Sequence, residues 1–83
     1  MFYCYILRCS DDTLYTGYTN DIDKRLIAHN SGNGAKYTKA RRPCTLVYKE
    51  EFADKSSAMK REYYIKHNMT KKEKEELICK WKG

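Results

Sequence analysis

Residues 2–19 read FYCYILRCSDDTLYTGYT, and this stretch decides the fold. Residues 2–9 are apolar or aromatic at nearly every position, so both faces of an extended chain would be apolar. That pattern is typical of a strand that is covered on two sides and lies in the middle of its sheet. SDDT at 10–13 has the composition of a turn. Leu14 to Tyr18 then forms a second strand, and the stretch predicts a hairpin.

The remaining chain predicts helices around one further strand. Asn20 or Asp21 can cap a helix that ends near residue 30, and Gly32 can terminate it with a positive φ. Residues 31–42 are interpreted as a flexible, basic loop. The later elements expected are a strand over 44–52 after Pro43, a helix over about 55–67 capped by Asp54 or Ser56, and a last helix, KKEKEELICKWK at 71–82, capped by Thr70.

These elements predict an α+β fold with a small three-stranded antiparallel sheet flanked by helices, in the order β-β-α-β-α-α. We expect one domain over residues 1–83. The chain has 17 basic and 11 acidic residues and a net charge of +6. This balance favours nucleic acid as a partner, and a basic surface kept for solubility is the alternative.

Cysteine usage and the absence of long apolar runs bear on location. The four cysteines form no CxxC pair, so a zinc site has little support. The sequence shows no signal peptide and no run long enough to span a bilayer. We therefore expect a soluble cytoplasmic protein with free thiols and no membrane association.

The helix expected after the hairpin carries two polar residues on its apolar stripe. Arg25 and His29 share this stripe with Ile22 and Leu26, at helical spacing. Arg25 could hold a phosphate through its planar fork, or form a surface salt bridge with Asp21. His29 could transfer a proton near neutral pH, or be a satisfied histidine at the edge of the core.

Glu62, in KREYYIK at 60–66, is a carboxylate within an apolar stripe formed by Ala58, Met59 and Ile65. Burying a lone carboxylate is costly, so a cation should accompany it. It could be a ligand for a hard divalent metal such as Mg²⁺. The alternatives are a solvated face or an ion pair with Arg61, Lys66 or Arg25.

Tyr3-Cys4-Tyr5 and Tyr15-Thr16-Gly17, on the two strands of the hairpin, correspond to the two short motifs that open the GIY-YIG nuclease superfamily. Both differ in letters from the motifs that name the family: the second keeps its Tyr and Gly, and the first keeps its final Tyr. Tyr5 and Tyr15 stand ten residues apart, as the family pattern expects. Arg25, His29 and Glu62 match the family's later positions. The chain resembles the small stand-alone bacterial single-domain members of this superfamily.

The resemblance implies a metal-dependent endonuclease that hydrolyses phosphodiester bonds, in DNA rather than RNA. It implies one divalent ion, Mg²⁺ or Mn²⁺, held by Glu62, with Arg25 orienting the phosphate. Tyr15 would deprotonate the attacking water, Tyr5 would support it and His29 would share the proton relay. Gly17 would let the backbone turn closely beneath the site, or be an ordinary strand-end glycine.

The basic loop is the expected nucleic-acid interface. One aromatic ring and four cations could contact a strand: Tyr37, Lys36, Lys39, Arg41 and Arg42. A mobile charged loop without this role is the alternative. One family position lacks a clear match, because Asn68 follows Glu62 by only six residues and the expected Asn position lies near Lys71, Lys72 or Lys74.

That departure leaves two other functions open. One is a weak or inactive nucleic-acid-binding module of the same fold that acts with a targeting protein. The other is a protein-interaction adaptor with no nucleic-acid role. Salt-dependent binding without cleavage would favour the first, and no binding at low salt would favour the second.

Overall fold

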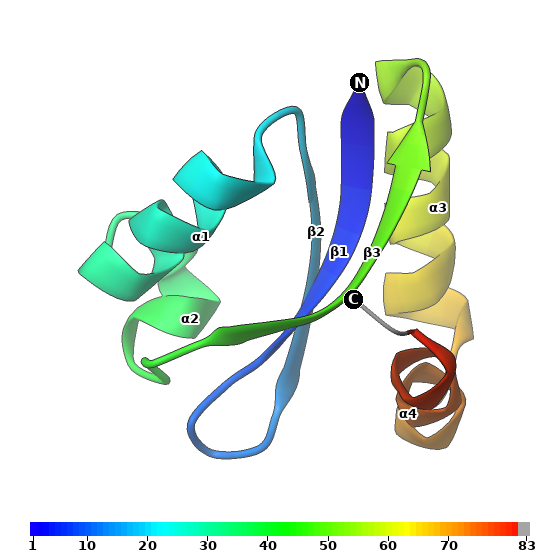
Figure 1. Ribbon diagram of the computed structural model, residues 1–83. Coiled ribbons are helices and arrows are strands. Elements are labelled where there is room, and N and C mark those ends of the chain that lie inside the picture. Colours follow the sequence, from blue (N-terminus) through cyan, green and yellow to red (C-terminus); the bar gives the residue numbers. More distant parts are fainter. Residues whose placement is uncertain (82–83) are drawn as a thin grey trace.

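The structure is a computed structural model that describes residues 1–81. Its sheet has three antiparallel strands, β1 (Phe2–Arg8), β2 (Leu14–Thr19) and β3 (Thr45–Phe52), in the order β2-β1-β3 (Figure 1). β1 therefore lies in the centre, which confirms the prediction drawn from its apolar run.

Helices cover both faces of the sheet (Figure 1). The helices α1 (Ile22–Ser31) and α2 (Lys36–Lys39) lie on one face, and α3 (Lys55–Asn68) and α4 (Lys71–Lys80) lie on the other. The predicted fold class and element order are confirmed. The interpretation of residues 31–42 as a loop was wrong in part, because α2 forms within it. Lys82, in the predicted last helix, lies outside the described residues.

Alternate side chains of β1 enter two separate cores. Tyr5, Leu7 and Cys9 pack with Cys44 on the α1 side. Cys4 and Ile6 pack with Ile65 of α3 on the other side, where the partly buried Leu77 and Ile78 of α4 also join them. Both cores need apolar residues from this strand, which explains why its sequence does not alternate with polar positions.

Side-chain and backbone caps fix where α1 begins and ends. The Asp21 carboxylate accepts a hydrogen bond from the backbone N–H of Lys24. Gly32 ends the helix with φ of 90°, a left-handed conformation that suits glycine. These two predicted caps are confirmed, and they set the helical phase that turns Arg25 and His29 toward the sheet. Within residues 1–81, no helix is long and apolar enough to cross a bilayer.

Candidate active site

Side chains from three elements meet on the α1 face of the sheet. Tyr5 comes from β1, Tyr15 from β2 and His29 from α1. The ring centroids lie 6.4 Å apart for Tyr5 and Tyr15, 6.0 Å for Tyr5 and His29, and 5.1 Å for Tyr15 and His29. The three rings therefore form one cluster built from β1, β2 and α1.

Gly17 makes room for this cluster. It lies opposite Tyr5 in the antiparallel pairing of β1 and β2. A Cβ atom added at Gly17 would fall 2.6 Å from the Tyr5 hydroxyl oxygen and 2.7 Å from Cζ. The glycine is thus required by the close approach of the Tyr5 ring, and it is more than an ordinary glycine at the end of a strand.

A chain of hydrogen bonds fixes the tautomer of His29. The Thr38 hydroxyl donates to the Ala35 carbonyl oxygen at 3.0 Å, so it accepts from His29 Nδ1–H, which lies 2.7 Å away. Nε2 is then unprotonated and accepts the Tyr5 hydroxyl hydrogen bond at 2.9 Å. Tyr5, His29 and Thr38 are all buried, so water does not compete for these bonds.

Burial sets the protonation states of this chain. Burial, with a further contribution from the Arg25 charge, lowers the pKa of His29 to about 4. Burial raises the pKa of Tyr5 to about 12, although Arg25 opposes this shift. At neutral pH both groups are therefore uncharged, and the Tyr5 hydroxyl acts as a hydrogen-bond donor. His29 is a fully buried residue with both nitrogens bonded, and it does not sit at an exposed edge.

Acid is expected to destabilise the protein through His29. An unfolded histidine has a pKa near 6.5, so below that pH the unfolded state binds a proton that the buried His29 takes up only near pH 4. The stability present above pH 6.5 is therefore lost progressively as the pH falls toward 4. The expected loss at that pH is on the order of 3 kcal/mol in the free energy of unfolding. Urea unfolding from neutral pH to about pH 4 measures it.

His29→Gln and His67→Gln are the matched variants for this measurement. Carboxylates with lowered pKa values, such as Asp54, lose stability in acid in every variant and cancel in the comparison. His67 is exposed on α3. We expect His29→Gln to flatten the pH dependence and His67→Gln to leave it unchanged. An equal slope in wild type and His29→Gln would contradict the assignment.

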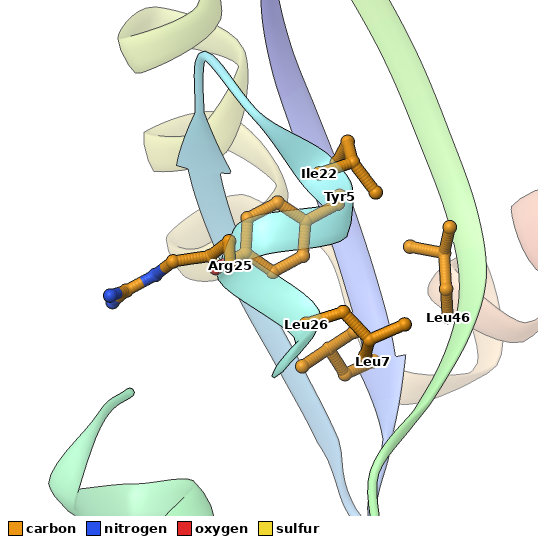
Figure 2. Close-up of a pocket in the computed structure, with 6 residues that line it drawn as sticks. All are labelled: Tyr5, Leu7, Ile22, Arg25, Leu26 and Leu46. Atoms are coloured by element: carbon orange, nitrogen blue, oxygen red, sulfur yellow. The ribbon is translucent and has the colours of Figure 1, made fainter. Parts of the chain in front are cut away.

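Arg25 lines the cluster from the α1 side. Figure 2 shows its aliphatic stem beside the Tyr5 ring and its guanidinium directed away from the apolar side chains of Leu7, Leu26 and Leu46. Hydrogen bonding with the Tyr5 hydroxyl raises the pKa of Arg25, against the effect of burial. Among residues 1–81 no carboxylate lies within salt-bridge distance, so the alternative pairing with Asp21 is not formed.

Glu62 reaches the cluster only indirectly. It lies on α3, behind the sheet from α1, and its side chain is 19% exposed. Its Oε2 atom lies 3.9 Å from Lys66 Nζ, so one of the expected alternative ion pairs is present. Lys66 Nζ in turn lies 5.8 Å from the centroid of the Tyr15 ring. The Lys66 side chain therefore lies between Glu62, the predicted metal ligand, and Tyr15, the predicted base.

The predicted nucleic-acid-binding residues divide into two kinds. Arg41 pairs with Asp11 at 3.1 Å and stacks on the Tyr37 ring, with Cζ 4.1 Å from the centroid. Arg42 donates to the Lys39 carbonyl oxygen at 2.8 Å. Both guanidinium groups therefore contribute to holding the 31–42 segment. Lys36 and Lys39 are exposed, and Tyr37 lies 5.9 Å from Tyr15 between ring centroids.

Two further residues of the site were not singled out from the sequence. Thr38 orients His29, and Asn30 joins the end of α1 to the residue that precedes β3, through two hydrogen bonds with the backbone of Cys44 at 2.9 and 2.7 Å. Neither has a sequence signal of its own, because each acts through a tertiary contact.

Comparison with known proteins gives a consistent assignment. The model of the GIY-YIG catalytic domain matches residues 1–76. A UPF0213 protein of Staphylococcus saprophyticus is 64% identical, over 77% of this chain and 78% of the relative. A UPF0213 protein of Clostridium perfringens is 55% identical, over 94% of this chain and 83% of the relative.

Solved structures agree with the fold. The solution NMR structure of a UPF0213 protein from Bacillus halodurans is 48% identical with a TM-score of 0.59, covering 95% of this chain and 84% of that one. The NMR structure of a protein from E. faecalis is 40% identical with a TM-score of 0.61, covering 93% and 81%. Proteins with this domain are generally nucleases. The chain belongs to the GIY-YIG family, where it groups with the UPF0213 proteins.

Proposed function

We propose that this protein is a divalent-metal-dependent endonuclease that hydrolyses phosphodiester bonds, with DNA preferred over RNA. The observation that carries the proposal is the cluster of Tyr5, Tyr15 and His29 against the Arg25 side chain. Two phenols, an oriented imidazole and a guanidinium without a carboxylate partner within residues 1–81 suit a reaction in which water attacks an anionic phosphate.

The protonation state of Tyr5 and the hydrogen bonds of His29 give the two tyrosines different roles. Tyr5 keeps its proton at neutral pH, because its pKa is about 12, and donates it to His29 in a hydrogen bond. His29 uses its other nitrogen for Thr38. Tyr15 is then the phenol left to interact with the attacking water, and we assign it the role of general base. Tyr5 and His29 position the cluster around it.

Arg25 is assigned to the phosphate. Its planar fork can contact two phosphate oxygens, and it stays charged at any working pH. Its aliphatic stem packs among the Tyr5 ring and neighbouring apolar side chains, so little ordering is needed when substrate binds. The positive charge would stabilise the extra negative charge of the pentacovalent transition state.

Glu62 is assigned to the metal. Within residues 1–81 no group of three or more acidic, histidine or cysteine side chains is arranged to enclose an ion. A single half-buried carboxylate, with Lys66 Nζ 3.9 Å away, still fits Mg²⁺, which often takes one protein carboxylate and completes its shell with water and substrate phosphate. Such an ion, Mg²⁺ or Mn²⁺, would supply positive charge against the charge that grows on the phosphate.

The segment around α2 is assigned to substrate binding. Lys36 and Lys39 are exposed and would contact the phosphate backbone. Tyr37 offers a ring for base stacking, and Arg41 supports its other face. Arg42 adds a positive charge near the same surface, and its Nε–H donates a hydrogen bond to the Lys39 carbonyl oxygen.

Removing the Arg25 side chain is expected to impair catalysis. Arg25→Ala should lower the cleavage rate by about 10²-fold, the cost typical of losing one group that stabilises transition-state charge. Lys24→Ala, an exposed neighbour on α1, removes the same charge and should change the rate little. Single-turnover cleavage of labelled DNA measures both. Equal rates in Arg25→Ala and Lys24→Ala would remove Arg25 from the mechanism.

The proposal is tested by incubating the protein with labelled single-stranded, duplex and branched DNA, in EDTA, Mg²⁺ or Mn²⁺. We expect at least one substrate to be cut with metal and none to be cut in EDTA. The pairing of Glu62 with Lys66 favours a second candidate function, a nucleic-acid-binding module that acts with a partner protein. Salt-dependent binding without cleavage of any substrate would select that second function.

A further inference from the structure

A cleft lies beside Tyr15, at the β2 edge of the sheet. It has a volume of about 160 Å³ and is lined by residues from both helical layers: Leu14, Tyr15, Thr16, Tyr37, Lys66 and Lys74. β2 is an edge strand, so α2 on one face and α3 with α4 on the other can approach each other around it. The cleft therefore adjoins the candidate active site and shares Tyr15 with it.

The lining of this cleft fits an anion. Among residues 1–81 its only charged lining groups are the two ammonium groups of Lys66 and Lys74, and none of those residues adds an acidic side chain to the lining. Lys74 is half-buried and forms no ion pair with any residue of the range 1–81. Lys66 has one weak pairing, with Glu62 at 3.9 Å, and is half-exposed. Two cations that line the same cleft, with little local neutralisation, attract a phosphate.

The size and walls of the cleft narrow the ligand further. Pockets that enclose drug-sized molecules usually measure about 300–1,000 Å³. A cleft of about 160 Å³ is smaller, so it suits a phosphate and part of a sugar better than a whole nucleotide. The Leu14 side chain and the Tyr15 ring provide an apolar wall for the sugar. Tyr37, 38% exposed, stands at the cleft where an adjoining base could stack.

We propose that Lys66 and Lys74 bind a phosphate of the nucleic-acid strand that flanks the phosphate cleaved beside Tyr15. This inference rests on the proposed function, because it takes Tyr15 to mark the scissile position. It adds a second anchoring point, built by α3 and α4 across the sheet edge from Arg25. Two anchored phosphates would fix the direction in which the strand crosses the site.

Binding without metal tests the inference separately from cleavage. The probe is a short, fluorescein-labelled single-stranded DNA in EDTA, and fluorescence anisotropy over a salt series gives affinity and salt slope. For Lys66→Gln/Lys74→Gln we expect about tenfold weaker binding at low salt, and a slope of log K against log salt that is less steep by about 0.7, the value of one phosphate contact.

The matched control is Lys60→Gln/Lys72→Gln. It removes the same charge from the same two helices at exposed positions that do not line the cleft. For this control we expect log K to fall by less than half as much as in Lys66→Gln/Lys74→Gln, because only the change in net charge weakens binding. Lys66→Arg/Lys74→Arg keeps both charges and should bind within a few-fold of wild type, which excludes a folding defect as the cause of weak binding.

The outcomes separate this inference from the proposed function. Equal losses in the cleft variant and the control would overturn the cleft, and so would a wild type that fails to bind at low salt. A specific loss of binding in the cleft variant, with no cleavage by wild type, would support the cleft and reject the nuclease. If wild type cleaves DNA but Lys66→Gln/Lys74→Gln and Lys60→Gln/Lys72→Gln lose equal affinity, the cleft is rejected as a phosphate site and the nuclease proposal stands.

Discussion

Replacing Glu62 with Gln is expected to lower metal-dependent cleavage by roughly 10²- to 10³-fold. Gln keeps the size of the side chain but removes the negative charge that a hard divalent cation requires. Within residues 1–81 no group of acidic or histidine side chains stands ready to replace it as a metal site. The loss should therefore persist at high Mg²⁺. Single-turnover cleavage over a Mg²⁺ series measures the effect.

DNA binding distinguishes this loss from a folding defect. Glu62→Gln removes a negative charge next to Lys66, so binding in EDTA should be equal to or tighter than that of wild type. Glu76→Gln, an exposed carboxylate on α4, is the matched control and should cleave normally. Full activity in Glu62→Gln would show that Glu62 is not the metal ligand, or that the activity comes from a contaminant.

Tyr15→Phe is expected to lower the cleavage rate by roughly 10²- to 10⁴-fold, the range typical of losing a general base. The substitution removes one oxygen and keeps the ring that packs against His29 and Tyr37. The melting temperature and DNA affinity should therefore change little. The effect should fall on the rate of the chemical step, which single-turnover cleavage at saturating protein measures.

Tyr18→Phe supplies the comparison for this prediction. Tyr18 lies on the same strand, but it pairs with Cys4 and faces the opposite side of the sheet. We expect it to cleave at nearly the wild-type rate. If Tyr15→Phe also kept its rate, the assignment of Tyr15 as general base would be wrong, and the Tyr5–His29 pair would be the next place to look for that group.

The fold followed from the sequence because its signals are local and agree with one another. The apolar run of β1 required cover on both faces, and Asp21 and Gly32 marked the two ends of α1. Helical spacing placed Arg25 and His29 together, and the order of elements brought them against Tyr15. In each case the information lies within about ten residues of the chain.

The features that were missed depend on contacts between distant segments. The four-residue helix α2 has weak local preference, and the buried Thr38 bond to His29 helps to hold it in place. The cleft between Lys66 and Lys74 forms only when α3 and α4 pack at the β2 edge. The distance from Glu62 to the tyrosines could not be inferred, because it depends on how far α3 reaches around that edge.

Helical-wheel reasoning also overestimated one part of α3. Met59 was placed in the apolar stripe around Glu62, but it is 42% exposed and lies outside both cores. α3 packs on the sheet through a narrow stripe of side chains that contains the buried Ala58 and Ile65. Glu62 lies at the edge of that stripe, which leaves its carboxylate half-buried and able to bind an ion from solvent.

The most direct test of this account is one metal titration, run on wild type, Glu62→Gln and Tyr15→Phe with the labelled DNA that wild type cuts best. The account predicts cleavage by wild type that requires Mg²⁺ or Mn²⁺ and stops in EDTA, together with the loss of cleavage in both variants at every metal concentration. Cleavage that persists unchanged in both variants, or that proceeds in EDTA, would contradict it.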